Sequence, residues 1–376
     1  MTSSRPAVAR APALSARLTV DLGAIVRNWR ALDAMTADTC ETAAVVKADA
    51  YGCGAEVVGP ALARAGCRTF FVAMPEEAFL LRAAVGPEPL IYVFAGLDAD
   101  PATTTEMVGQ RIRPVLNSVE QVAYAASVAI VEDGLSAAVQ LDTGMNRLGL
   151  EEREAIQILS DPQGSFADGH LDIDLILSHM GCADDAAHPL NAEQRACFDR
   201  ICAADPHSPS PTRSLSATAG TLLGPAYHYS MTRIGIGLYG GFPYDAGEPA
   251  VTLEAPILQI RDLAPGESVG YGASWTAQRP SRIATIPVGY ADGLLRALSN
   301  GAAAYLNGTA VPLAGRVSMD LITLDVTDRP CAPGDMVEIL GPNQSIDALA
   351  EAAGTIGHEV LTSLGARYGR RYLPDG

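Results

Sequence analysis

Along the first two thirds of the chain, short apolar runs alternate with segments whose apolar residues recur at helical spacing. The apolar runs predict strands at 43–47, 69–73, 89–94, 113–116, 136–141, 172–178, 212–216 and 234–239. The helical spacing predicts helices around them, at 22–35, 55–65, 75–84, 118–127, 151–160, 190–203 and 218–223. Strands separated by helices of crossover length pair in parallel, so this α/β pattern favours a closed (β/α)8 TIM-type barrel.

The pattern changes near residues 240–249, where glycine and proline cluster. Beyond this point, runs typical of strands are broken by Pro and Gly, at 251–263, 282–288, 302–306, 321–326 and 336–340. Two helical segments follow, at 345–353 and 357–364. We therefore expect a disordered tail at 1–15, a barrel domain at 16–246, and a C-terminal mostly-β domain at 247–376.

Composition narrows the possible partners. The 376 residues include 26 basic and 43 acidic side chains, a net charge of −17, which argues against binding to nucleic acid or an anionic membrane by charge. The seven cysteines are scattered and odd in number, as in a reduced cytosolic protein without structural zinc. No leader or membrane-spanning run is evident, so we expect a cytoplasmic protein whose partners are small molecules or another protein surface.

Lys47 is the only lysine in the chain, and all 25 other basic residues are arginine. It closes an apolar run, whereas a lysine left by coding bias would be expected on a polar face. An amine can lose its proton and attack a carbonyl, which a guanidinium cannot do. The chemistry that needs such an amine is imine formation, with a sugar aldehyde or with pyridoxal phosphate.

Other reactive side chains follow the predicted strands, and the carboxyl ends of barrel strands meet at one mouth. Arg147 follows the fifth strand, His179 ends the sixth, Thr218 follows the seventh, and Arg233 precedes Gly235-Ile236 at the eighth. Each has an ordinary alternative: Arg147 as a surface charge, His179 as a core histidine, and Arg233 as an ion pair at the bottom of the barrel. Their common location favours function. Backbone amides near the eighth strand and the helix starting at Thr218 could hold an anion.

Several segments, in the same order, resemble the signatures of alanine racemases, pyridoxal-phosphate enzymes of fold type III. The first is the cofactor attachment motif, Val46-Lys47-Ala48-Asp49-Ala50-Tyr51-Gly52. The others are 141–149, 232–240, 270–273, 287–293 and 315–320. The resemblance spans residues 16–370. It implies an N-terminal barrel, a C-terminal β domain that takes in the strand near 16–20, and a homodimer whose second subunit completes each active site.

The resemblance also implies residue roles. Lys47 would hold the cofactor and move a proton on one face of the substrate carbon, and Tyr271 of the partner subunit would act on the other face. Two bases on opposite faces are what inversion requires. A free tyrosine has a pKa of about 10, so Tyr271 needs nearby positive charge or polar contacts to act near neutrality, and His179 would provide them.

The remaining roles concern binding. Arg233 would face the pyridine nitrogen of the cofactor and, staying protonated, keep that nitrogen unprotonated. Arg147 would hold the cofactor phenolate and the substrate carboxylate, the latter together with the Met319 amide. Tyr290 would narrow the entrance. The phosphate would be bound by Tyr51, Thr218, Gly235 and Ile236.

The sequence departs from the family pattern at four places. Cys53 replaces a histidine common in the attachment motif, and Ala217-Thr218 replaces Asn-Ser. Gln140 stands where many members carry a carbamylated lysine, so Arg147 would be positioned by Gln140, an anion or both. Tyr368 does not align cleanly with a phosphate-binding tyrosine of the family and is not assigned to the site.

The resemblance implies racemisation of L- and D-alanine, supplying D-alanine for peptidoglycan. Three alternatives remain open at this point. The first is a broader amino-acid racemase that acts on serine or basic side chains. The second is a decarboxylase of related fold, and the third is a non-catalytic pyridoxal-phosphate carrier, which would have little use for a second domain bearing Tyr271 and Met319.

Overall fold

The computed structural model describes residues 15–160, 170–206 and 210–375, so residues 1–14 of the expected tail lie outside the described part. The described residues divide into two compact units, one within 22–250 together with 374–375 and the other of residues 15–21 with 251–373. None of the helices in the described ranges is both long enough and apolar enough to cross a membrane.

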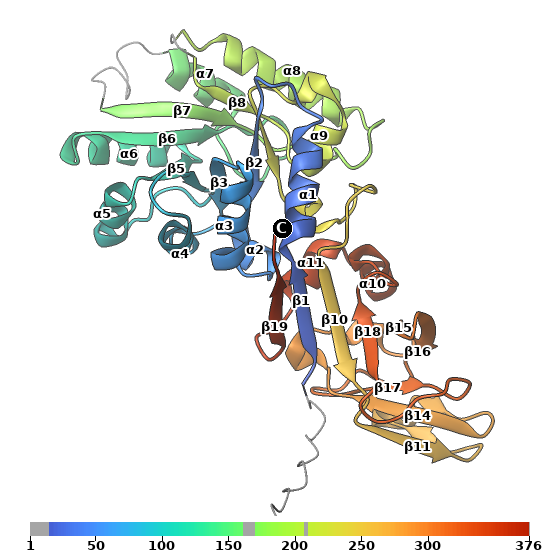
Figure 1. Ribbon diagram of the computed structural model, residues 1–376. Coiled ribbons are helices and arrows are strands. Elements are labelled where there is room, and N and C mark those ends of the chain that lie inside the picture. The colour runs from blue at the N-terminus through green and yellow to red at the C-terminus, as the bar shows by residue number, and fades with distance from the viewer. Residues whose placement is uncertain (1–14, 161–169, 207–209, 376) are drawn as a thin grey trace, which may run out of the picture. The chain divides into compact units, whose positions relative to one another are not determined.

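The larger unit is built on an eight-stranded parallel sheet with strand order β8-β7-β6-β5-β4-β3-β2-β9 (Figure 1). Its strands are β2 (Glu41–Val45), β3 (Thr69–Val72), β4 (Leu90–Val93), β5 (Ile112–Leu116), β6 (Leu135–Gln140), β7 (Leu171–Leu177), β8 (Thr212–Ser214) and β9 (Met231–Ile234). The two end strands also meet, because the Ser230 amide donates to the Arg213 carbonyl at 3.0 Å and the Arg233 amide to the Ser216 carbonyl at 2.9 Å. The predicted barrel is therefore confirmed, and a few backbone hydrogen bonds next to β8 and β9 close it.

Helices separate the strands as the pattern predicts. They are α1 (Leu22–Asp33), α2 (Lys47–Tyr51), α3 (Ala55–Ala65), α4 (Pro75–Val85), α5 (Pro101–Gly109), α6 (Val119–Val131), α7 (Glu152–Ser160), α8 (Leu190–Ala203) and α9 (Thr218–Leu222), with the 3-10 turns η1 (Pro225–Tyr227) and η2 (Ile236–Tyr239). Local chemistry sets several boundaries. The Ser118 hydroxyl accepts from the Gln121 amide at the start of α6, and Gly66 ends α3 in the left-handed region.

The prediction for the eighth strand is wrong in position. Residues 234–239 were expected to be extended, but β9 ends at Ile234 and η2 occupies residues 236–239. The strand is shifted to Met231–Ile234, where it pairs in parallel with β2 from Glu41↔Met231 to Ala44↔Ile234. The polar Thr232 and Arg233 conceal this strand in the sequence, because both side chains are buried where an apolar residue would be expected.

The smaller unit is mostly β. A six-stranded sheet has the order β16-β15-β18-β10-β1-β19, and smaller sheets contain β11-β14-β17 and β12-β13. Its elements are β1 (Arg17–Asp21), β10 (Val251–Pro256), β11 (Gln259–Leu263), β12 (Ser268–Val269), η3 (Tyr271–Ala273), β13 (Trp275–Thr276), β14 (Ser281–Ile286), η4 (Tyr290–Asp292), η5 (Arg296–Leu298), β15 (Ala303–Leu306), β16 (Thr309–Pro312), β17 (Ile322–Asp325), β18 (Met336–Leu340), α10 (Ile346–Ala353), α11 (Gly357–Thr362) and β19 (Gly369–Leu373). Strand β1 pairs antiparallel with β10 and parallel with β19, so the start of the described chain belongs to this sheet.

Candidate active site

Lys47 lies directly after the end of β2, at the start of a left-handed turn. The Val46 amide donates to the Phe71 carbonyl at 2.9 Å, which fixes the end of β2 against β3. The next four residues, Ala48 to Tyr51, have φ values of 52°, 55°, 53° and 56°. None is glycine, and the left-handed conformation costs a residue with a Cβ about 1–2 kcal/mol. A strained segment of this kind persists only where its surroundings impose it, and such segments gather at functional sites.

Backbone and side-chain hydrogen bonds impose this turn. The Ala50 amide donates to the Val46 carbonyl and the Gly52 amide to the Ala48 carbonyl, both at 2.8 Å. The carboxylate of Asp49 accepts from the Ala55 amide at 2.7 Å and joins the turn to the start of α3. The strained residues therefore hold Lys47 at one end of the turn and Tyr51 at the other in fixed positions.

The surroundings of Lys47 favour a neutral amine. Burial lowers the pKa of Lys47, and the guanidinium groups of Arg147 and Arg233 lower it further, against the opposing charge of Glu77. The side-chain nitrogen lies 5.8 Å from the ring centroid of Phe94, and Phe94 itself stacks on Phe71, with the ring centroids 5.2 Å apart. An amine in such a setting is a better nucleophile and base near neutral pH than a solvated lysine.

Arg233 lies on β9 and is 2% exposed, and it forms no ion pair with any side chain in residues 15–160, 170–206 or 210–375. Its Nη1 donates to the Ser214 carbonyl at 2.8 Å and to the Ser214 hydroxyl at 2.6 Å, and its Nη2 donates to the Ser178 carbonyl. Burial lowers its pKa to about 9. These bonds fix the plane of the guanidinium and leave Nε as the donor without a partner among the described residues. The ion pair inside the barrel is a different one, between Arg113 and Asp174.

His179 is a neutral imidazole. Burial first, and then the positive charges of Arg233, Arg147 and Lys47, together lower its pKa to about 3. A neutral ring carries no positive charge with which to help Tyr271 ionise. A polar contact from the neutral ring remains the only help that His179 can give.

The turn at Gly235 brings together the side chains of Thr218 and Tyr51. The Thr218 hydroxyl oxygen accepts from the amides of Gly235 at 3.1 Å and Gly237 at 3.3 Å. A Cβ at Gly235 would collide with the hydroxyl of Tyr51, so glycine is required there for the close approach. The Gly235 amide is thus engaged by Thr218, whereas the Ile236 amide has no acceptor in the described ranges. A tyrosine hydroxyl, a buried threonine and an open backbone amide form a donor set that fits a phosphate group.

Arg147 lies on the loop between β6 and α7, and its side chain is exposed. The loop is closed by Asp142, whose carboxylate accepts from the amides of Gly144 at 2.9 Å and Asn146 at 3.0 Å. The buried Gln140 side chain donates to the Leu148 carbonyl at 3.0 Å. Gln140 therefore positions the backbone next to Arg147, and within the described residues it makes no hydrogen bond to the guanidinium itself.

Three predicted site residues belong to the smaller unit, and their side chains are exposed: Tyr271 at 71%, Met319 at 53% and Tyr290 at 44%. The Tyr290 amide donates to the Ser318 carbonyl at 2.9 Å, so the turns that carry Tyr290 and Met319 are joined. Arg367 strengthens this junction, because it donates to Asp292 in one turn and to Asp320 in the other, both at 2.7 Å.

Comparison with known proteins agrees with this arrangement. Residues 20–243 match the family model for the alanine racemase N-terminal domain, and residues 250–372 match the model for the alanine racemase C-terminal domain. The chain belongs to the alanine racemase family. An alanine racemase of Cereibacter sphaeroides (strain ATCC 17029 / ATH 2.4.9) is 49% identical over 95% of this chain and 98% of its own length. A catabolic alanine racemase of Agrobacterium fabrum is 46% identical over 96% of this chain and 93% of its own length.

A solved structure gives the same result. The crystal structure of alanine racemase from Bartonella henselae, with covalently bound pyridoxal phosphate, has a TM-score of 0.89 and 39% sequence identity, covering 96% of this chain and all of that one. As in other alanine racemases, a barrel domain is followed by a mostly-β domain, so the fold class and the family expected from the sequence are both confirmed.

Sequence reasoning missed the residues that hold the racemase loops together. The amide side chain of Gln194, on α8 and fully buried, donates to the Thr143 hydroxyl at 3.2 Å and to the His179 carbonyl at 2.9 Å, and it accepts from the Gly181 amide at 2.8 Å. Thr143 also shares a hydrogen bond of 2.9 Å with Ser178. A glutamine on a polar helix carries no sequence signal for such a role, since only the fold brings α8 to these loops.

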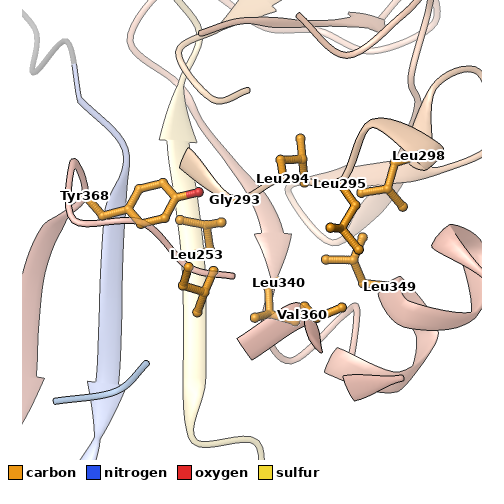
Figure 2. Close-up of a pocket in the computed structure, with 10 residues that line it drawn as sticks. Leu253, Gly293, Leu294, Leu295, Leu298, Leu340, Leu349, Val360 and Tyr368 are labelled. Carbon is orange, nitrogen blue, oxygen red and sulfur yellow. The ribbon is translucent and has the colours of Figure 1, made fainter. Parts of the chain in front are cut away.

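Tyr368 lies in a pocket of the smaller unit (Figure 2). Its ring is 5% exposed, and its hydroxyl is buried without a hydrogen-bond partner among the described residues. The rest of the lining is apolar apart from backbone, with side chains such as Leu253, Leu298 and Leu349. Tyr368 is packed into the core of its own unit, which agrees with leaving it out of the phosphate site.

Proposed function

We propose that this chain is a pyridoxal-phosphate-dependent alanine racemase that uses Lys47 on one face of the substrate and Tyr271 of a partner subunit on the other. The observation that carries the proposal is the environment of the only lysine in the sequence, a half-buried amine of lowered pKa beside Arg147 and Arg233. The family assigns the enzyme class, an isomerase, and indicates pyridoxal phosphate as the cofactor.

The barrel residues fit this cofactor. Lys47 would bind its aldehyde carbon. Its phosphate would be surrounded by Tyr51, Thr218, Gly235 and Ile236. Its ring would be contacted by Arg233, Arg147 and His179. Gly235 contributes the space above Tyr51, and the open amide is that of Ile236. When bound, pyridoxal phosphate withdraws electrons and stabilises negative charge at the substrate carbon.

The chain's own residues move the protons. The neutral amine of Lys47 removes the Cα proton from one face, and the hydroxyl of Tyr271 gives a proton to the opposite face, so that configuration inverts and the proton count is unchanged. In the reverse direction the two residues exchange roles. Arg147 and the Met319 amide hold the substrate carboxylate. Arg233, with a pKa of about 9, stays protonated near neutral pH and would leave the ring nitrogen unprotonated, which limits how much negative charge the ring can accept. The reaction therefore needs residues from both units.

The same proposal includes a homodimer with shared active sites. Tyr271 is 71% exposed and stands on a short turn between Gly270 and Gly272, both at a φ of 70°. An aromatic side chain presented in this way fits a surface that another chain covers. Mixing inactive Lys47→Ala chains with inactive Tyr271→Phe chains should restore about a quarter of the wild-type activity after random exchange in a two-site dimer. Full exchange of chains, shown by mass spectrometry, without recovery would contradict a shared site.

The proposal also includes alanine as the preferred substrate, a role in peptidoglycan synthesis and a cytoplasmic location. All seven cysteines are free thiols, as expected for a reducing compartment.

The test of the proposed function is a visible absorption spectrum of the purified protein before and after addition of L-alanine, paired with chiral analysis of the product. We expect a bound-cofactor band and conversion to D-alanine. Faster turnover of serine, lysine or arginine would favour a broad racemase, and a coloured protein that leaves every amino acid unchanged would favour a carrier.

A further inference from the structure

The carboxylate of Glu77 joins three backbone amides from two separate segments of the barrel mouth. Glu77 lies in the first turn of α4. Its Oε2 accepts from the amides of Ala73 at 2.7 Å and Met74 at 3.1 Å, at the end of β3. Its Oε1 accepts from the Ala48 amide at 2.6 Å, and Ala48 is the first strained residue after Lys47. Hydrogen bonds to an ionised carboxylate are commonly short, and those from Ala48 and Ala73 have such lengths.

A capping role explains only half of this arrangement. A glutamate three residues into a helix commonly accepts a hydrogen bond from the amide of the N-cap residue, which here is Met74. That role uses Oε2 and needs nothing from the β2 side. The bond from Ala48 to Oε1 crosses to a segment 29 positions earlier and has no part in capping α4. The capping role at this position could also be filled by glutamine, whereas this bridge needs the length and both oxygens of a glutamate.

We propose that Glu77 is a positioning residue for the cofactor lysine, holding the left-handed turn between Lys47 and Tyr51 against the end of β3. The inference rests on the proposed function for the importance of Lys47, but its structural content does not depend on racemisation. At one end, the turn sets the direction of the Lys47 side chain. At the other end, it sets the position of the Tyr51 side chain next to Gly235. Loosening the Ala48 amide would therefore disturb the amine and the phosphate side of the site together.

Glu77 also acts on Lys47 by charge. The charged groups that bear on the amine are the guanidinium groups of Arg147 and Arg233 and the carboxylate of Glu77, with His179 neutral beside them. Among these groups Glu77 is the only anion. It keeps the pKa of Lys47 from falling as far as burial and the two arginines would take it. Removal of its charge in an otherwise intact fold should lower the pKa of Lys47 further.

The test uses the fact that the chain has a single lysine. Acetylation of the full-length, cofactor-free chain by acetic anhydride across a pH series reports the titration of Lys47, and mass spectrometry separates its peptide from the N-terminal amine. For Glu77→Gln we expect the midpoint of this profile to move down by about 0.5–1 pH unit, because a neutral side chain of the same length, with one acceptor oxygen in place of two, replaces the anion. For Glu77→Ala we expect hydrogen exchange of the Ala48 amide to become at least about tenfold faster, since its acceptor is lost.

Glu76→Gln is the matched control, because Glu76 is an exposed glutamate on the same helical turn. It should leave both the labelling midpoint and the exchange rate at their wild-type values. A Glu77→Gln chain that folds, as judged by circular dichroism, and titrates like wild type would overturn the proposal, as would unchanged Ala48 exchange in Glu77→Ala. Neither readout uses the racemase reaction. A protein that fails to racemise alanine but shows both shifts would disprove the proposed function and leave the role of Glu77 intact.

Discussion

The two units present their site residues in opposite ways. In the barrel, Arg233 is buried and held by hydrogen bonds through both terminal nitrogens, and Lys47 and Tyr51 flank a turn fixed by several hydrogen bonds. In the smaller unit, the side chains of Tyr271, Tyr290 and Met319 are exposed, although the turns beneath them are tied together. The barrel residues of the proposed site are thus held in place before any ligand binds, whereas those of the smaller unit are exposed and, in the proposed dimer, would be covered by a partner. Substitutions should therefore affect folding and activity together in the barrel, and activity alone in the smaller unit.

The strongest effect is expected from Lys47→Arg. Arginine keeps the positive charge but cannot form an imine or remove a proton, so the covalent link to the cofactor should be lost and racemisation should fall by about 10⁴-fold or more. Borohydride reduction followed by peptide mapping checks the link, and chiral product analysis checks the rate. A reduced cofactor adduct that persists in the variant would show that another group is the anchor.

Tyr271→Phe should separate the two faces of the substrate. We expect kcat for racemisation to fall by about 10²–10⁴-fold, with the absorption spectrum of the bound cofactor unchanged. In heavy water, one enantiomer of alanine should still exchange its Cα proton through Lys47 without inverting. Because the side chain is exposed, the free energy of unfolding should change by less than about 0.5 kcal/mol. Wild-type racemisation by this variant would rule out Tyr271 as a base.

The pH dependence of stability tests the barrel cluster. The folded pKa of His179 is about 3, against 6.5 for an ordinary histidine, so between these values the unfolded chain binds one more proton than the folded chain. The free energy of unfolding must then fall as the pH falls below 6.5, by about 1.4 kcal/mol per pH unit from this group, with no contribution above 6.5. His179→Gln should remove this contribution.

Urea unfolding of the cofactor-free wild type and His179→Gln at pH 7 and pH 4.5 measures the difference. Acidic groups that titrate in both proteins cancel in the comparison, so the wild type should lose roughly 2–3 kcal/mol more than the variant on acidification. Parallel losses in the two proteins would mean that His179 takes up its proton in the folded state and contributes a positive charge to the site after all.

The contrast between the units also explains what could be predicted from the sequence. The helices at 55–65 and 190–203 were predicted to the residue, because periodicity and, for the first, Gly66 mark them. The small residues after Lys47 indicate a turn, but its left-handed geometry could not be predicted, since Ala48, Asp49 and Ala50 give no local sign of it. Its cause lies partly in Glu77, far along the chain, and long-range causes of this kind leave no periodic pattern.

The identities of the site residues were easier to predict than their partners. A lone lysine and a sequence of motifs point to roles, but the burial that makes His179 neutral and the bond that engages the Gly235 amide depend on the assembled barrel. Gln140 shows the same limit. Its place in the motif suggested that Gln140, an anion or both position Arg147, and only the fold shows that its amide donates to the Leu148 carbonyl.

The smallest effect is expected at Arg367, in the support beneath the exposed residues. Its guanidinium donates to Asp292 and to Asp320, and so fixes the turns that carry Tyr290 and Met319. In Arg367→Gln the Asp292 carboxylate still accepts from the Gly289 amide at 2.9 Å, so the fold should survive. The Met319 amide would be less well placed for the substrate carboxylate, and we expect KM for alanine to rise about three- to tenfold with kcat nearly unchanged.

Arg371→Gln, at an exposed arginine on β19, is the control. If both variants keep the wild-type KM, the turns hold their geometry without Arg367, and the outward face of the smaller unit is more rigid than its hydrogen bonds suggest.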